Sequence, residues 1–452
     1  MEADGLDTYR VRLRITVPLL LLLTILESYA VLFLSTPIAQ SDRAGRDDRN
    51  IFFFIAGVLG LAFSVYATRH KAQNRSEPDG ALGWLAVLLP CYAAFQLLPL
   101  PLFALRILSP ARAKLAEALT PVGLGVSFAP LSVTPSLSLV HFLLFASYGV
   151  VFLLVRKIAR WSGDAPWLPV LPILGIAAWQ GAWGVQQFLE GGAQPFAHGT
   201  YPVKNHFAGL LEMSLPFAIA FGAAALVKGY ANPPLSLTAA LKAGGGFSIG
   251  AIVIVGILTS LSRMGLVASI GSVFVMGALA LAGKMRWPLL LAWGAATTLA
   301  FAFMAPVQLV LRFSEISSEG RIDVWKDTLH LIAAYPIFGT GLGGYQSAFE
   351  RFKTSGFAAA QDYAHNDYLQ FFAELGLTGF LIGGIFLFLI LVTSVRASLQ
   401  YSNPDARWIA VACSGALVAI LIHSVADFNL YVPANAMLLA WICGVAAGEP
   451  AD

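Results

Sequence analysis

The sequence predicts an all-α polytopic membrane protein with about twelve transmembrane helices and one large external loop that contains short helices. The 452 residues are 58% hydrophobic and only 12% charged, whereas soluble domains carry about 25% charged residues. Many apolar runs are long enough for a helix to cross a bilayer, and a β-barrel would alternate polar and apolar residues instead. A net charge of +3 gives no reason to expect nucleic acid, so the expected surroundings are a phospholipid membrane.

The first span follows three arginines, Arg10, Arg12 and Arg14, and its apolar run of about 20 residues ends without a small-residue cleavage site. We therefore expect an uncleaved membrane helix rather than a signal peptide. The twelve spans are expected near residues 15–34, 51–67, 82–104, 135–155, 167–189, 206–228, 246–262, 264–283, 287–310, 371–395, 407–425 and 430–447.

The distribution of basic residues predicts the orientation. With the N-terminus in the cytoplasm, the inner segments hold fifteen Lys and Arg residues, and the short outer loops hold eight. Positive charge is enriched in short cytoplasmic loops, and long loops are discounted in this comparison. Both termini are therefore expected to be cytoplasmic, and the long loop 311–366 is expected on the outer side.

The loop 311–366 has an internal helical pattern. Arg321, Val324 and Trp325 begin a repeat at helical spacing, and Tyr335-Pro336 predicts where that helix ends. The glycine-rich stretch 338–344 satisfies GxGxxG, but no strand precedes it, so we expect a tight turn rather than a nucleotide site. A second short helix is expected over 345–352. The chain then divides into nine spans over 1–310, the loop 311–366 and three spans over 367–452, within one integrated domain.

Ionisable and amide groups gather at the outer ends of the spans and in the long loop. They are Lys204, Asn205, His206, Glu212, Arg263, Arg321, His365, Asn366, Asp367, Glu374, His423, Asp427 and Asn429. Polar groups beside a hydrocarbon core are costly, so this one-sided convergence predicts a functional site that faces the outer side.

These residue types suit anion binding and proton transfer. Arg263, Arg321 and Lys204 can bind phosphate oxygens, and His365 can serve as a base or as a neutral donor. A helix N-terminus at the start of the tenth span also favours negative charge. The sequence has no HExxH, no DxD and no paired cysteines, so neither a metal nor another cofactor is expected.

Each residue also has a structural interpretation. Arg263 and Lys204 could serve as cationic anchors at a membrane interface. His365 could be a histidine that caps a helix or lies in a loop. His423 and Asp427, four residues apart, have the spacing of a pair on one helix face. The occurrence of all these residues on one side of the protein favours a functional site over these separate structural roles.

The chain resembles the superfamily of O-antigen ligases and O-antigen polymerases, which are bacterial envelope glycosyltransferases. The resemblance covers residues 195–440 and rests on several short motifs in a fixed order. These are Lys204–Gly209, Ser262–Gly265, Arg321–Trp325, Pro336–Gly341, Ala364–Gln370 with Glu374–Gly376, and His423–Phe428.

The resemblance implies a twelve-helix fold with a periplasmic loop and metal-independent, inverting glycosyl transfer. The implied donor is a glycan on undecaprenyl diphosphate. The acceptor is lipid A-core in ligases, a second lipid-linked glycan in polymerases, and protein in a third branch. The implied location is the bacterial inner membrane, with the active site on the periplasmic side. Ligase-like transfer is the preferred expectation, and a polymerase is the alternative.

The resemblance also implies roles for individual residues. The essential arginine and histidine of the family fall on Arg263 and His365, which are the expected catalytic residues together with Arg321. Lys204 stands where ligases often carry an arginine, and lysine binds diphosphate only as a point charge. The expected substrate-binding residues are Lys204, Asn205, His206, Asn366, Asp367, Asp427 and His423.

Two other classes of protein remain open on the residues alone. A twelve-span transporter would have related halves and binding groups near the bilayer midplane, and the sequence has neither. A non-catalytic scaffold of envelope assembly would tolerate the loss of His365 and Arg263.

Overall fold

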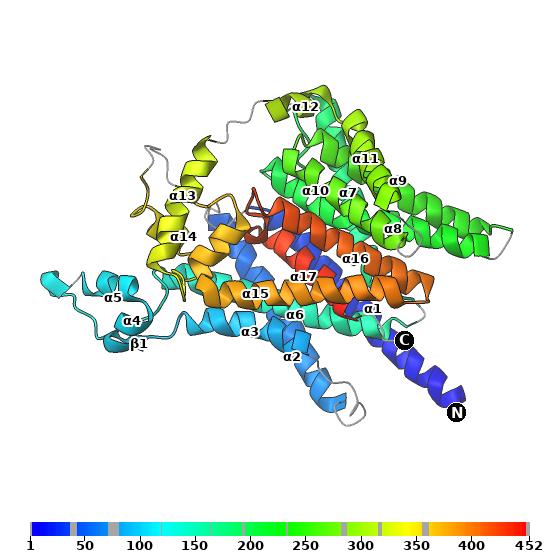
Figure 1. Cartoon of the computed structure of the whole chain (residues 1–452). Coiled ribbons are helices and arrows are strands. Elements are labelled where there is room, and N and C mark those ends of the chain that lie inside the picture. The colour runs from blue at the N-terminus through cyan, green and yellow to red at the C-terminus, as the bar shows by residue number, and fades with distance from the viewer. Residues whose placement is uncertain are drawn as a thin grey trace.

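The computed structural model is almost entirely helical (Figure 1). It describes residues 2–36, 43–70, 81–118, 120–163, 165–191, 195–231, 234–281, 287–314, 319–354 and 361–448. The long helices are α1 (Glu2–Phe33), α2 (Arg43–His70), α3 (Ala81–Phe95), α6 (Pro135–Trp161), α7 (Leu171–Glu190), α8 (Lys204–Ala231), α9 (Leu237–Thr259), α10 (Arg263–Ala280), α11 (Trp287–Met304), α15 (Asp367–Gln400), α16 (Pro404–His423) and α17 (Pro433–Gly448).

Shorter elements connect the long helices. They are α4 (Leu102–Leu108), α5 (Pro110–Glu117), α12 (Val307–Ser314), α13 (Glu319–Ala334), α14 (Tyr345–Phe349) and the 3-10 turns Thr120–Val122, Leu168–Val170 and η4 (Asn429–Tyr431). Two short antiparallel strands, β1 (Leu100–Pro101) and β2 (Phe128–Ala129), pair Leu100 with Ala129 and Pro101 with Phe128.

The predicted all-α membrane fold is confirmed. Among the described residues, eight helices are long and apolar enough to cross a membrane, and three shorter apolar helices accompany them. Each of the twelve predicted spans overlaps one long helix, although the number that cross the bilayer stays a prediction. The span expected over 82–104 is wrong at its end, because α3 stops at Phe95. Pro99 and Pro101 follow closely, and proline lacks the N–H that continues a helix.

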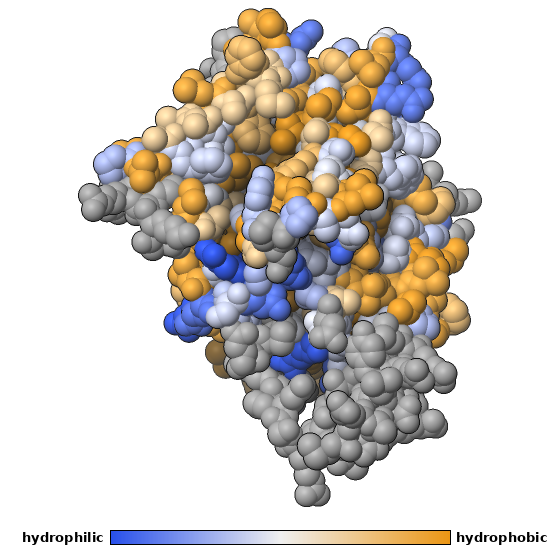
Figure 2. Space-filling model, turned by 90° about the vertical axis from the view of Figure 1, so that its right-hand side faces the viewer, coloured by the Kyte–Doolittle hydropathy of each residue, from blue (hydrophilic) through white to orange (hydrophobic). Residues whose placement is uncertain are grey.

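The two chain ends lie at one end of the helical bundle. The beginning of α1 and the end of α17 lie together, and α13 and α14 lie at the opposite end (Figure 1). Figure 2 faces the end with the chain termini, where hydrophilic side chains form patches among hydrophobic ones. The start of α1 and the end of α17 therefore lie away from α13 and α14, and the side of the membrane on which each lies stays a prediction.

Small residues allow the long helices to approach closely. A Cβ on Gly246 of α9 would lie 2.6 Å from the backbone nitrogen of Gly222 on α8, and one on Gly448 of α17 would lie 2.5 Å from Cβ of Ala159 on α6. Such close contacts are typical of helix pairs in membranes. Helices α8 and α16 are the most enclosed of the candidate spans and form the centre of the bundle.

Helix α15 is kinked at Gly376, whose φ of 62° and ψ of −173° are not helical. The loop 336–344 docks against this kink. The N–H of Leu377 donates to the carbonyl of Pro336 at 2.8 Å, and the N–H of Gly341 donates to the carbonyl of Glu374 at 2.9 Å. A Cβ on Gly376 would lie 2.3 Å from the carbonyl oxygen of Ile337, so the docked loop leaves room for glycine only.

Tyr92 of α3 and Gln96, the first residue after this helix, donate hydrogen bonds to carbonyl groups at the kink. The hydroxyl of Tyr92 donates to the carbonyl of Leu375 at 2.7 Å, and the side-chain amide of Gln96 donates to that of Glu374 at 3.0 Å. Buried carbonyl groups need such partners, because an unmade hydrogen bond is costly in an apolar region. The glycine-rich stretch is therefore a structural loop, as the sequence predicts, with positive φ at Gly339, Gly341 and Gly343.

Candidate functional site

The site lies at the end of the bundle where α8 and α15 begin and α16 ends. Asn366 caps α15: its side-chain oxygen accepts the N–H of Leu369 at 3.0 Å, and its amide donates to the carbonyl of Val425 at 2.8 Å. The carboxylate of Asp367 accepts a hydrogen bond from the Ser424 hydroxyl at 2.8 Å. These bonds fix the loop after α16 against the start of α15. The side chains of Asn366 and Asp367, both predicted to bind substrate, therefore make hydrogen bonds within the protein.

His365 precedes the cap in a left-handed backbone conformation, with φ of 51°. This conformation is uncommon for residues other than glycine, and such residues cluster at functional sites. Its half-buried ring meets the edge of the Phe428 ring at 4.9 Å between centroids. Tyr363 stacks on the same ring at 4.2 Å, and His206 contacts it at 4.8 Å. Phe428 therefore holds three side chains of the site in place.

Helix α13 connects the two loops of the site through residues one helical turn apart. Arg321 donates from Nη1 to the carbonyl of Ala426 at 3.1 Å, and Trp325 donates from Nε1 to the carbonyl of Ala364 at 2.9 Å. The predicted Arg-x3-Trp motif thus places a guanidinium beside His365. Burial lowers the pKa of His365, and Arg321 lowers it further, while the carboxylate of Asp427 partly offsets both effects.

A row of four buried ionisable side chains leads from the bundle centre to the site. Both carboxylate oxygens of Glu212 on α8 lie 2.9 Å from Nδ1 of His423 at the end of α16. Nε2 of His423 lies 3.7 Å from Asp427, and Asp427 lies 3.5 Å from Nε2 of His206. All four side chains are at most 2% exposed. Burial alone would raise the pKa of Asp427, but His206 and His423 hold it well below its usual range.

This geometry corrects one structural interpretation of the sequence. His423 is the last residue of α16 and Asp427 lies in the loop beyond it, so the predicted pair forms around the end of the helix and not across a helix face. Their separation of 3.7 Å exceeds a direct hydrogen bond. Asp427 Oδ2, His423 Nε2 and both ring nitrogens of His206 are buried without a hydrogen-bond partner among the described residues. Native proteins rarely leave buried polar atoms in this state, and such clusters are typical of functional sites.

The other basic candidates begin α8 and α10. Lys204 is half-buried, with Nζ 4.6 Å from the ring centroid of Phe196, and Asn205 follows it on the first turn of α8. Arg263 is the first residue of α10 and is also half-buried. A Cβ on Gly265 would lie 2.7 Å from Cβ of Ala208, so the first turns of α10 and α8 are in contact.

The structure thus brings His365, Arg321, His206, Asp427 and His423 together, with Lys204 and Arg263 on neighbouring helix starts. Glu212 and Phe428 complete the cluster. Glu212 was among the polar groups expected to gather at the outer ends of the spans, but the sequence gave it no role in catalysis or substrate binding. Phe428 ends the His423–Phe428 motif, and its role depends on rings that are distant in the sequence.

The fold and the site define a multi-pass membrane protein with a basic and histidine-containing site at one end. Residues 249–383 match a family model described as O-Antigen ligase. The matched region runs from α9 into α15 and includes Arg263, Arg321 and His365. The chain is therefore similar to this family over residues 249–383, and its predicted resemblance to the superfamily is confirmed. No curated protein matches the chain.

Proposed function

We propose that this protein transfers a glycan from an undecaprenyl diphosphate carrier to lipid A-core at the periplasmic face of the bacterial inner membrane. The observation that carries the proposal is the convergence of Arg321, Asp427 and His206 on His365, in a chain whose residues 249–383 match the O-antigen ligase family. A guanidinium beside a neutral imidazole is suited to a phosphate leaving group and a hydroxyl nucleophile.

The donor diphosphate binds to basic side chains in this mechanism, without a metal or another cofactor. Arg321 already donates one hydrogen bond to the Ala426 carbonyl, and its guanidinium has further donors for phosphate oxygens. Arg263 and Lys204 add positive charge from the adjoining starts of α10 and α8. Together these groups stabilise the negative charge that develops on the departing diphosphate.

The transfer is one inverting step. The acceptor hydroxyl oxygen attacks the anomeric carbon, and the bond from that carbon to the diphosphate oxygen breaks. The electron pair leaves with the diphosphate, and the hydroxyl proton passes to the imidazole of His365. The low pKa of His365 keeps the imidazole neutral near pH 7 and able to accept this proton. The Asp427 carboxylate then stabilises the imidazolium that results.

The function is tested by glycan profiling of a deletion strain. We expect loss of all polymer from lipid A-core while lipid-linked polymer is retained. If single repeat units on lipid A-core remain and only chain length is lost, the protein is a polymerase. If purified protein moves a lipid-linked glycan across liposomes and transfers none to an acceptor, it is a transporter and the proposal is wrong.

The buried pair Glu212 and His423 gives a prediction on rate. In Glu212→Gln the amide keeps one acceptor for His423 but loses the negative charge that faces the His423 ring, on the side opposite Asp427. We expect transfer to fall by roughly 10- to 100-fold, the worth of a charged hydrogen bond. Transfer rates of purified protein measure this.

The matched control is Glu190→Gln, which changes the same residue type at the exposed end of α7. It should transfer at the wild-type rate. A Glu212→Gln protein that is folded and fully active would show that the buried pair has no part in the reaction.

The lowered pKa of His365 gives a prediction on pH. The base must be neutral, so activity should stay constant from about pH 8 to 6.5 and fall only below the ordinary histidine value. The pKa of His365 is lowered because burial disfavours the charged imidazolium. The acid limb of the rate of transfer, measured at fixed detergent and salt, checks this. An acid limb above pH 7 would contradict a neutral base.

A further inference from the structure

The short turn between α9 and α10 has a strained backbone. Helix α9 ends at Thr259 and α10 begins at Arg263, so the three residues 260–262 connect the two helices. Leu261 has a φ of 55°, in the left-handed region that bulky side chains rarely adopt. Among the residues that the structure describes, only Leu261 and His365 combine a side chain with a positive φ. One of these two is the proposed base, and the other lies two residues before Arg263.

Buried serines on either side of Leu261 stabilise the turn. The hydroxyl of Ser260 donates to the carbonyl of Ile257 at 2.6 Å and accepts the N–H of Ser262 at 3.2 Å. The hydroxyl oxygen of Ser262 caps α10 by accepting the N–H of Gly265 at 3.2 Å. Both serines are at most 1% exposed. The backbone on each side of Leu261 is therefore fixed, and so is the start of α10.

The side chain of Leu261 holds the strained backbone in place. It is 7% exposed and packs in the main hydrophobic core. Glycine would adopt the same φ without strain because it has no Cβ, but it would leave the turn without a side chain in the core. Burial of the leucine therefore maintains a backbone conformation that is itself unfavourable. Such strain persists where the surroundings fix it, and it clusters at functional sites.

The end of α9 also fixes the loop that precedes α8. The carbonyl of Thr259 accepts the N–H of Ala197 at 2.9 Å. The neighbouring residue, Phe196, lies under the side chain of Lys204, with Nζ 4.6 Å from the ring centroid. Two of the cations proposed to bind the donor, Lys204 and Arg263, are thus held by the same end of α9.

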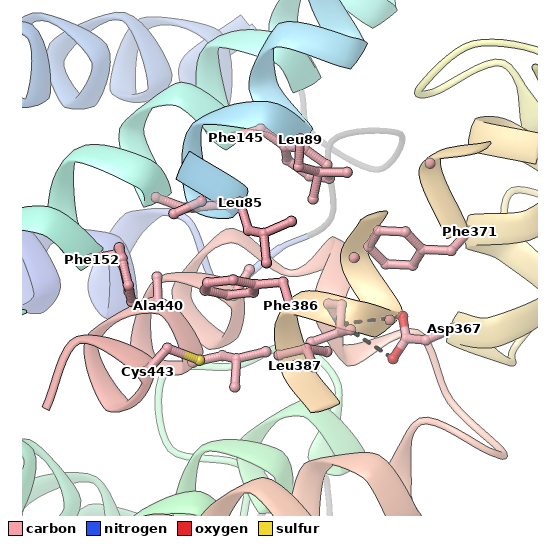
Figure 3. Close-up of a pocket in the computed structure, with 18 of the residues that line it drawn as sticks. Leu85, Leu89, Phe145, Phe152, Asp367, Phe371, Phe386, Leu387, Ala440 and Cys443 are labelled. Carbon is pink, nitrogen blue, oxygen red and sulfur yellow. Dashed lines mark hydrogen bonds between the residues drawn. The ribbon is translucent and has the colours of Figure 1, made fainter. Parts of the chain in front are cut away.

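The turn is separate from the apolar cavity that follows α15. Asp367 lies at one end of that cavity, and Figure 3 shows Phe152 and Cys443 at the other. In the part of the chain that the structure describes, the cavity walls come from α3, α6, α15, α16, α17 and the loop between α16 and α17, and they include no residue of α8, α9 or α10. A substitution in the turn therefore replaces no part of these walls, and its effect reports on the starts of α8 and α10.

We propose that Leu261 is a positioning residue, whose strained and buried turn sets Arg263 and Lys204 at the separation that the donor diphosphate requires. This proposal rests on the proposed function and adds a residue that acts through other side chains without touching substrate. Two cations bind a diphosphate well only when their separation matches its phosphate groups, and a displacement of about 1 Å can cost roughly 10²-fold in rate. A rigid turn sets this separation before the donor binds, so the donor does not have to order it.

Leu261→Gly tests the proposal, because it removes the buried side chain and releases the strain together. The probe is undecaprenyl diphosphate, which carries no glycan, and its binding to the purified full chain is measured by native mass spectrometry. We expect Leu261→Gly to weaken binding by about tenfold or more. Leu261→Met keeps a side chain of similar volume in the core and should bind as the wild type does. Wild-type binding by Leu261→Gly would overturn the proposal.

The matched control is Leu131→Gly, which removes a buried leucine from the loop before α6, at a residue whose φ is not positive. Its midpoint of thermal unfolding should fall further than that of Leu261→Gly, because no strain is released at Leu131. Its binding of the probe per folded protein should equal that of the wild type. If both variants lose binding in proportion to their loss of stability, Leu261 serves the fold alone and the proposal is wrong.

A double variant tests whether Leu261 acts through Arg263. Arg263→Ala alone should weaken binding of the probe, because it removes a guanidinium from the proposed diphosphate site. Addition of Leu261→Gly should then weaken binding by less than it does in the wild type, since the side chain that it positions is already absent. Fully additive losses in the double variant would contradict the proposal.

Transfer assays separate this proposal from the proposed function. If the variants bind the probe as expected but the wild-type protein transfers glycan to no acceptor, the proposed function is wrong and the positioning role stands. If the wild type transfers glycan and Leu261→Gly keeps the wild-type KM for the donor, the proposed function stands and the positioning role is wrong.

Discussion

Replacement of His365 should abolish glycan transfer while the protein remains folded. His365→Ala removes the proposed base, and loss of a general base costs roughly 10²- to 10⁴-fold in rate. The fold should tolerate the change, because the ring is half-buried and packs against Phe428. Single-turnover transfer by purified protein, together with its thermal unfolding, measures both effects.

Two further variants sharpen this test. His365→Asn suits the left-handed backbone and still offers a hydrogen-bond donor, but it cannot accept the proton. Equal loss in the Ala and Asn variants indicates a base, and retained activity in the Asn variant indicates an orienting donor. The control is His330→Ala, an exposed histidine on the neighbouring α13, which should behave as wild type. Transfer that survives both His365 variants would end the proposed mechanism.

Substitution of Gly376 should have the largest effect on folding. In Gly376→Ala the new Cβ would lie 2.3 Å from the Ile337 carbonyl oxygen and 2.4 Å from its carbon, at a φ of 62°. Both atoms are backbone, so the loop 336–344 must separate from α15. We expect a loss of more than about 3 kcal/mol, or no folded protein, because strain and lost backbone hydrogen bonds act together.

The matched control for Gly376→Ala lies two turns further along the same helix. Gly384→Ala meets no protein atom within 4 Å and should be neutral or stabilising by up to about 1 kcal/mol. The folded yield in detergent and the midpoint of thermal unfolding compare the two variants. Equal stability of both would show that the loop does not depend on the kink.

The sequence was sufficient to predict those helices and loops that a local pattern of residues specifies. Apolar runs predicted every long helix, and the pattern from Arg321 to Tyr335 predicted α13 almost to the residue, because helical periodicity is a local property. Pro336 and the glycines that follow predicted the loop for the same reason. The end of α3 was placed too late, since its apolar run continues past the prolines that stop the helix.

The contacts within the site were less predictable. The Glu212–His423 contact joins residues 211 positions apart, and no local pattern encodes that distance. Asn366 and Asp367 were expected to face a substrate, yet their side chains bind the loop after α16. A polar residue at a helix start serves equally as a cap or as a ligand. Only the position of the loop that it meets distinguishes the two.

The hydrogen bonds that hold the loop 336–344 against the kink of α15 have a consequence for protein engineering. Hydrogen bonds join the loop 336–344, the carbonyls around Gly376, and the donors Tyr92 of α3 and Gln96 just after it, although these groups come from three separate stretches of the chain. A chimera that exchanges only the loop 336–344 with a related protein would bring in carbonyls and glycines without their counterparts. Transplanting this loop therefore requires the end of α3, the loop and the first half of α15 to be exchanged together.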